Sequence, residues 1–192
     1  GGVYVTITLS ANASVYNLNM TAENGIDGFL HTAGFTLTVN GNANVDVASG
    51  ASNLTWVGIG ERSAAGAGIV DFKANVTIGT NAATSGSNKR SFFFGSPNSK
   101  LIFRGDLLLG RTNVISGTYR PGTIDFDGIG LQEVLWNNNL YFSNFNNVVV
   151  GNTNNPICRH VTGTYTPDNI LGNLTVNGSS TLDLATSQWI RD

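Results

Sequence analysis

Residues 37–47 contain the clearest repeat unit of the chain, Leu37-Thr38-Val39-Asn40-Gly41, followed after a short polar link by Val45-Asp46-Val47. The pattern returns near the end of the chain as Leu174-Thr175-Val176-Asn177-Gly178, followed by Leu182-Asp183-Leu184. In both copies apolar and polar residues alternate, and Asn-Gly separates the two halves. Alternation interrupted by Asn-Gly is typical of two short, half-buried strands joined by a tight corner. Because the motif recurs with the same internal spacing, it predicts a repeat architecture.

Weaker copies of the motif fill the sequence between the two clear ones. Each begins with an apolar residue, and these first residues are Ile7, Leu37, Val70, Leu101, Ile124, Val148 and Leu174. The copies follow one another at roughly 23 to 33 residues, a range typical of solenoids and related arrays. The third position is apolar in most copies, which predicts one column of interior residues: Val39, Phe72, Phe103, Phe126, Val150 and Val176.

Stacking these units predicts an all-β fold, namely a parallel β-helix (β-solenoid) of about seven irregular coils. Each coil contributes two or three short strands, and each strand pairs with its counterpart in the next coil. In this register Phe72, Phe103 and Phe126 belong to three consecutive coils and should form an internal aromatic stack. Residues 1–192 should form a single continuous segment. Because strand-like sequence reaches both ends of the chain, we expect a segment of a longer repeat protein.

Composition and charge exclude several classes of function. The formal net charge is −2 and only 11% of residues are charged, so no basic face for nucleic acid is expected. No run approaches the roughly eighteen apolar residues of a membrane span. Cys158 and His160 share one side of a predicted strand, but zinc needs three or four ligands and the other histidine, His31, lies far away in the repeat. We expect no metal site and, in the absence of a nucleotide-binding motif, no cofactor.

Two carboxylates are candidate catalytic residues. Asp125 and Asp127 occupy alternate positions of one predicted strand, so their side chains should leave the same face about 7 Å apart. A glycoside hydrolase could use such a pair as acid and base. The repeat register offers a second explanation, because it places Asp127 beside Arg104, Arg104 beside Lys73, and Asp71 one position away. We favour this second hypothesis, a solvent-exposed ladder of alternating charge, and expect no enzymatic activity.

Aromatic residues gather in two groups that could bind sugars. The candidate glycan-binding residues are Trp136, Tyr141, Phe142 and Phe145, which lie among asparagines. The second group is formed by residues 92–94, which are all phenylalanine. By alternation, half of each group should point into the core. The other half could line a sugar-binding groove, although caps over a loop-covered core are the favoured alternative.

Several segments resemble a known group of proteins: residues 34–41 (GFTLTVNG), 122–128 (GTIDFDG), 141–145 (YFSNF) and 172–184 (GNLTVNGSSTLDL). They are similar to the repeat regions of very large secreted surface proteins of gliding and related bacteria, which are exported by the type IX secretion system. The resemblance covers most of the chain. It implies an extracellular, cell-surface location and a non-enzymatic role as a structural stalk or adhesin segment. The partners that it implies are neighbouring coils of the same chain, surface glycans and secretion-system proteins, and a carbohydrate-binding or carbohydrate-cleaving β-helix domain is the alternative.

Overall fold

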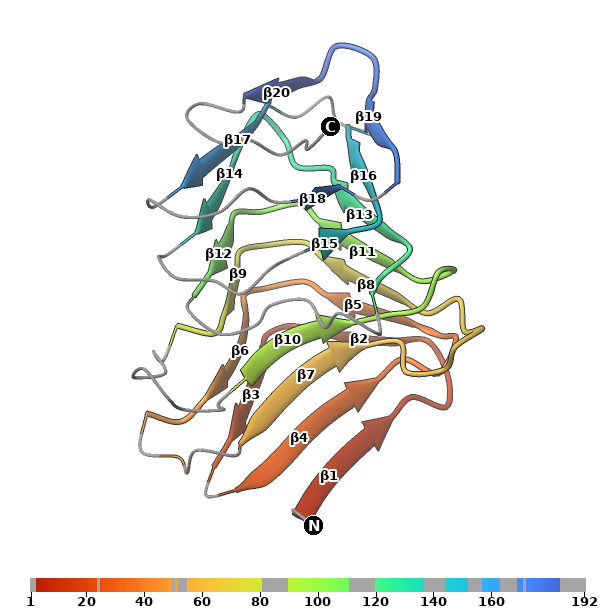
Figure 1. The fold of residues 1–192 in the computed structure, drawn as a ribbon, viewed down its shortest axis with the longest axis vertical. Helices are drawn as coiled ribbons and strands as arrows, with labels where there is room; N and C mark the ends of the chain where they lie inside the picture. The colour runs from red at the N-terminus through yellow and green to blue at the C-terminus, as the bar shows by residue number, and fades with distance from the viewer. Residues whose placement is uncertain are drawn as a thin grey trace.

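The structure, a computed structural model, describes residues 3–23, 25–49, 51, 55–80, 90–110, 120–136, 144–151, 157–162, 169–170 and 172–183. Within this part of the chain all regular structure is β-strand, and every strand pairing is parallel. Figure 1 shows the strands stacked above one another along the long axis, with β1 at one end and β20 at the other. The all-β class and the parallel, repeated strands predicted from the sequence are confirmed.

The strands belong to four sheets, which we name A to D. Sheet A contains β1 (Val3–Thr8), β4 (Ile26–His31), β7 (Trp56–Gly60) and β10 (Arg90–Phe94), in that spatial order. Sheet B contains β2 (Ala13–Val15), β5 (Thr36–Val39), β8 (Ile69–Phe72), β11 (Lys100–Phe103), β13 (Thr123–Phe126), β16 (Asn147–Val150) and β19 (Leu174–Val176). Sheet C contains β3 (Leu18–Ala22), β6 (Ala43–Val47), β9 (Val76–Ile78), β12 (Leu107–Leu109), β14 (Leu131–Trp136), β17 (Ile157–Thr162) and β20 (Thr181–Asp183). Sheet D pairs β15 (Asn144–Phe145) with β18 (Asn169–Ile170).

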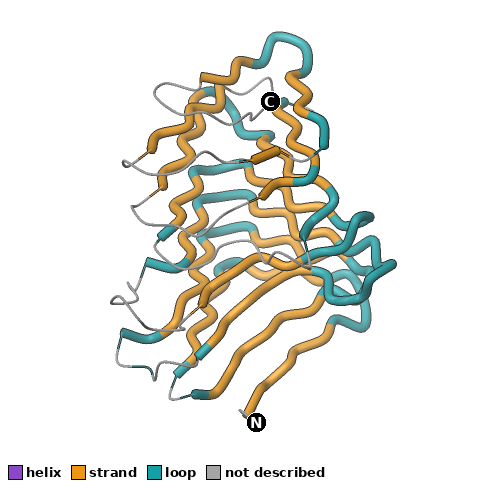
Figure 2. The backbone as a smooth tube through the Cα atoms, in the orientation of Figure 1, coloured by secondary structure: helices purple, strands orange, loops and turns teal. Residues whose placement is uncertain are grey.

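The chain visits the sheets in a repeating order. Its first twelve strands run from sheet A to sheet B to sheet C four times, and every later strand of sheet B is also followed by one of sheet C. Short loops join sheets B and C, for example residues 40–42, 73–75 and 104–106 (Figure 2). Parallel strands cannot be joined by a tight hairpin. Each strand therefore pairs with one from the previous or next passage through the same sheet.

The predicted interior column of sheet B is confirmed by its register. The pairings place Val39, Phe72, Phe103, Phe126, Val150 and Val176 opposite one another on successive strands. The first five are at most 1% exposed, whereas Val176 in the last strand of the sheet is 44% exposed. The rings of Phe72 and Phe103 stack 5.3 Å apart, and those of Phe103 and Phe126 stack 5.8 Å apart.

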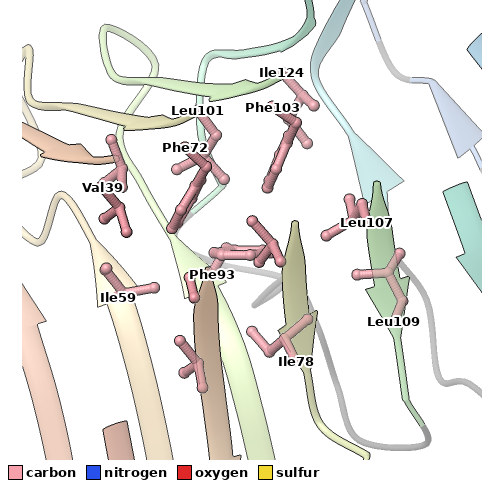
Figure 3. Close-up of a cluster of buried hydrophobic side chains, with 14 of the residues drawn as sticks. Val39, Ile59, Phe72, Ile78, Phe93, Leu101, Phe103, Leu107, Leu109 and Ile124 are labelled. Atoms are coloured by element: carbon pink, nitrogen blue, oxygen red, sulfur yellow. The ribbon is translucent and has the colours of Figure 1, made fainter. Parts of the chain in front are cut away.

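Sheet A packs against this aromatic stack through β10. Phe93 of β10 packs edge-on against Phe103 with 5.4 Å between ring centroids, and it contacts Phe72 at 6.0 Å (Figure 3). Edge-to-face and offset arrangements at these distances are the favoured geometries for aromatic pairs. The stack is therefore held both along the column and from the side, and it lies at the centre of the hydrophobic core.

Polar corner residues link each repeat to the next. A side-chain oxygen of an asparagine or aspartate accepts a hydrogen bond from a backbone N–H of the following repeat at 2.9–3.0 Å in five such pairs: Asn12–Thr36, Asn17–Asn42, Asn75–Asp106, Asp106–Glu133 and Asn147–Asn173. Corners leave backbone donors without a ladder partner, and asparagine and aspartate side chains are suited to satisfy them. This arrangement gives one physical reason for the abundance of asparagine.

Glycine occupies the fifth position of the copies that begin at Leu37 and Leu101, as Gly41 and Gly105, for a steric reason. A Cβ atom at Gly105 would lie 2.5 Å from the backbone carbonyl carbon of Ala74 and 2.6 Å from Oδ1 of Asn75. A Cβ atom at Gly41 would likewise lie 2.8 Å from the backbone oxygen of Tyr16. Backbone atoms of the preceding corner fill the space that a side chain would need. The close approach of the preceding corner thus requires glycine at Gly41 and Gly105.

We expect Gly105→Ala to lower the free energy of unfolding by about 1–3 kcal/mol, because the methyl group would overpack against backbone that cannot move aside cheaply. Gly28→Ala is the matched control, since its added Cβ atom would meet only Val57 Cγ2 at 3.8 Å and Ala22 Cβ at 4.0 Å. Denaturant unfolding of the two variants makes the comparison. Equal destabilisation would contradict the corner packing described here.

One predicted copy begins at the wrong residue. Ile7 lies in β1 of sheet A, where it pairs with Leu30. The residue that pairs with Leu37 is Ala13 of β2. Alternation identifies a strand but reads the same in every sheet, so the sequence pattern alone assigned Ile7 to sheet B.

Candidate functional site

The two candidate catalytic carboxylates come from β13 and the residue after it. Phe126 between them points into the core, so Asp125 and Asp127 lie on the outer face of sheet B. Both are nevertheless buried, at 1% and 2% exposure. Asp125 Oδ2 lies 2.5 Å from Lys100 Nζ, and Asp127 Oδ2 pairs with Arg104 Nη1.

The predicted charge ladder is confirmed in its pairing. Arg104 bridges two strands, because its Nη1 contacts Asp127 and its Nε donates to Asp71 Oδ1 at 3.1 Å. Asp71 Oδ2 in turn lies 2.5 Å from Lys73 Nζ. Partial burial alone would lower the pKa of the Arg104 guanidinium, but its hydrogen bonds and charge attraction with Asp71 and Asp127 outweigh this effect and raise the pKa.

The predicted solvent exposure of the ladder is wrong at its acidic end. The side chains of Asp125 and Asp127 are 1% and 2% exposed, against 23% for Arg104 and 29% for Lys100. Short carboxylates lie close to the sheet, and the longer basic side chains extend past them with their charged ends toward water. Position on the outer face therefore does not mean exposure. A substrate has no direct access to either carboxylate in this arrangement.

A third buried carboxylate, Glu61, follows β7 and forms a cluster at the end of sheet A. Its Oε1 lies 2.6 Å from His31 Nε2 and accepts a hydrogen bond from Ser63 N at 2.8 Å. Its Oε2 accepts hydrogen bonds from Thr32 Oγ1 at 3.0 Å and from Gly34 N at 2.6 Å. Glu61 thus fastens the end of β7 to the turn that follows β4.

The sequence pattern did not identify Glu61, because this residue lies in a glycine- and alanine-rich stretch, residues 60–68, that is typical of a loop. The spacing of the sequence nevertheless contains a signal for this cluster. His31 and Glu61 are separated by one repeat length, so the repeat register places them side by side. Burial of Glu61 opposes its charge, but four hydrogen bonds outweigh this effect and lower the pKa of its carboxyl group.

The lowered pKa gives a stability that depends on pH. This contribution is fully present above the ordinary carboxyl value of 4.5 and is lost as the pH falls through the lower value of the folded state. We expect Glu61→Gln to be less stable than the wild type near neutral pH and to differ less from it at about pH 3. Thermal unfolding at both pH values tests this, with the exposed Glu23→Gln as control. A gap between wild type and Glu61→Gln that stays constant with pH would contradict the prediction.

Most of the candidate glycan-binding group lies outside the residues that the structure describes. Trp136 ends β14, where its backbone pairs with Leu109, and Phe145 lies in β15. The side chains of these two residues, and the whole of Tyr141 and Phe142, lie outside the described residues. The second aromatic group is described. Phe93 points inward, whereas Phe92 and Phe94 lie on the outer face of sheet A, as alternation predicts.

Among the described residues, no group of three or more His, Cys, Asp or Glu side chains is arranged to hold a metal ion. Cys158 and His160 lie in β17, and their side chains are outside the described part of the structure. The described residues include no helix long and apolar enough to cross a membrane. Compared with known proteins, the chain matches no family model, no curated protein and no solved structure.

Proposed function

We propose that residues 1–192 form one parallel β-helix of about seven irregular coils. The observation that carries this proposal is the unbroken, in-register pairing of sheet B from β2 to β19, with sheet C following the same order. At about 4.8 Å per strand spacing, seven coils extend roughly 30 Å. A body of this kind gains length with each added repeat, because each repeat contacts mainly its neighbours.

The function that best fits such a body is a non-enzymatic stalk or adhesin segment of a large exported cell-surface protein. Its ionised groups support a structural role, because Asp71, Asp127 and Glu61 bind residues of the adjacent repeats. The extracellular location, type IX export and a connection with gliding motility rest on the sequence resemblance. Neighbouring coils, surface glycans and secretion-system proteins remain the proposed partners.

A surface-exposure experiment on the full-length protein in its own cells tests the proposed location and role. Protease treatment of intact cells should remove the segment, and antibodies against residues 1–192 should label unpermeabilised cells. Retention of the segment inside intact cells would contradict the proposal.

A second measurement addresses the enzymatic alternative. The purified chain should release no new reducing ends from a panel of neutral and acidic polysaccharides. Cleavage that is present in the wild type and lost in both Asp125→Asn and Asp127→Asn would replace the stalk by a carbohydrate-cleaving β-helix. The burial and ion pairing of both carboxylates favour the first outcome.

A further inference from the structure

The outer face of sheet A carries a cluster of aromatic side chains that the repeat brings together from three strands. Phe29 of β4 and Phe92 of β10 both pair with Gly58 of β7, and their rings lie 6.0 Å apart across it. Phe94 packs 5.9 Å from Phe92, and Trp56 packs edge-on at 6.5 Å. Residues about 30 positions apart in the chain thus form one surface.

Gly58, at the centre of this surface, has no side chain and leaves room for the neighbouring rings. A Cβ atom at Gly58 would lie 3.0 Å from Phe94 Cδ1 and 3.1 Å from Phe92 Cε2, so the rings occupy the space above the glycine. Phe29, Trp56 and Phe92 stay half-buried rather than buried. Aromatic carbon therefore reaches solvent on the outer side of the sheet, where strand alternation would ordinarily place polar residues.

Two arginines lie on the cluster. Arg62 Cζ is 5.1 Å from the centroid of the Phe29 ring, and Arg90 Cζ is 5.1 Å from the ring of Trp56. Neither guanidinium makes a hydrogen bond or ion pair with any residue that the structure describes. Arg104 on sheet B differs, because two carboxylates hold it. Stacking on a ring orders a guanidinium while leaving its N–H edges able to donate.

Among the residues that the structure describes, two acidic side chains lie on or beside this face, and both accept hydrogen bonds. Asp27 Oδ1 accepts a hydrogen bond from the backbone N–H of Trp56 at 2.8 Å. Glu61 is buried and bound to His31. Two ordered cations and half-buried aromatic carbon therefore share one exposed surface.

We propose that this surface, formed by Phe29, Trp56, Phe92, Arg62 and Arg90, binds an acidic oligosaccharide that contains uronic acid. Guanidinium groups pair with carboxylates in a bidentate geometry. The apolar C–H faces of sugar rings can cover the aromatic carbon between the two arginines. A sheet face suits an extended polymer, and strand geometry places the Cα atoms of Phe29 and Trp56 about 8 Å apart, which suits two successive sugar rings.

Two other anionic polymers fit the surface less well. Nucleic acid would face a chain of net charge −2 with only 10 lysines and arginines in 192 residues. An acidic peptide supplies carboxylates but presents no apolar ring face to the aromatic carbon. The inference extends the adhesin role of the proposed function by naming a ligand class, and it rests on that proposal only for its biological setting.

The binding test uses the whole chain and three probes in calorimetric titrations: hexagalacturonate, its fully methyl-esterified form, and hexaglutamate. We expect hexagalacturonate to bind, with at least tenfold weaker binding of the other two. Binding should weaken as salt is added, because exposed charges are screened. No binding of hexagalacturonate, or equal binding of hexaglutamate, would overturn the proposal.

Variants locate the binding surface. Arg62→Gln and Arg90→Gln should each weaken hexagalacturonate binding at least tenfold with unchanged thermal unfolding, since both side chains reach solvent. Lys73→Gln removes a partly exposed cation from the loop that follows β8, away from sheet A, and should leave binding unchanged. Equal weakening by Lys73→Gln would show non-specific charge attraction and overturn the site. If hexagalacturonate does not bind but the segment is exposed on intact cells, the acidic oligosaccharide is excluded as the ligand and the stalk proposal stands.

Discussion

Phe103→Ala is expected to lower the free energy of unfolding by about 3–5 kcal/mol, the largest effect that we predict for one side chain. Phe103 is 1% exposed and its ring contacts those of Phe72, Phe93 and Phe126. Removing the ring opens a cavity that is enclosed by the neighbouring strands β8 and β13 and by sheet A. Such a site cannot collapse without shifting the paired backbone, so little of the loss can be recovered.

Thr38→Ala is the control for this prediction. Thr38 lies on the outer face of β5 in the same sheet and is only half-buried. Its replacement should change stability by less than about 0.5 kcal/mol. Chemical denaturation of both variants measures the difference, and comparable losses would mean that the assignment of inner and outer faces is wrong.

Asp127→Asn should cost about 2–3 kcal/mol, less than the full cost of breaking a buried ion pair because Arg104 is partly exposed and keeps Asp71. The substitution preserves shape but leaves Arg104 without one of its two carboxylates. A fully exposed ladder would lose only roughly 0–1 kcal/mol. Burial of Asp127 at 2% exposure makes the difference.

A double-mutant cycle with Arg104→Met separates the ion pair from other effects of each substitution. Lys73→Met is the comparison for an exposed pair, because the Lys73 side chain is 37% exposed. It should cost less than about 1 kcal/mol. Urea unfolding near neutral pH tests all of these variants. If Asp127→Asn lowered the free energy of unfolding by less than Lys73→Met, solvent would be screening the Arg104–Asp127 pair and the prediction would be wrong.

Much of sheet B could be predicted because its inward positions are apolar in strand after strand. The triplets at Leu37, Val70, Leu101 and Ile124 each place two apolar residues inward, and the structure pairs them in that register. Sheet A was harder to predict. Its strand β7 reads Trp-Val-Gly-Ile-Gly, where glycines replace the polar residues of the alternation.

The polar clusters could be predicted only in part. The repeat register places Asp71, Arg104 and Asp127 together, but side-chain length and local cover decide burial, and no pattern in the sequence encodes them. The cluster around Glu61 and the aromatic surface at Gly58 share one difficulty. Each joins residues about one repeat apart within irregular stretches, where the register is visible only once sheet A has been recognised.

The distance between spin labels at positions 38 and 175, measured by pulsed electron–electron double resonance, is the sharpest test of whether the repeats stack as one continuous β-helix. Thr38 of β5 and Thr175 of β19 share the outer face of sheet B, and Cys158 would be replaced by serine. Five strand spacings separate them, which predicts about 24 Å between their backbones, and a second pair at positions 38 and 149 should be about 5 Å closer. Equal distances for the two pairs, or a separation of 38 and 175 below about 15 Å, would contradict the stacked order.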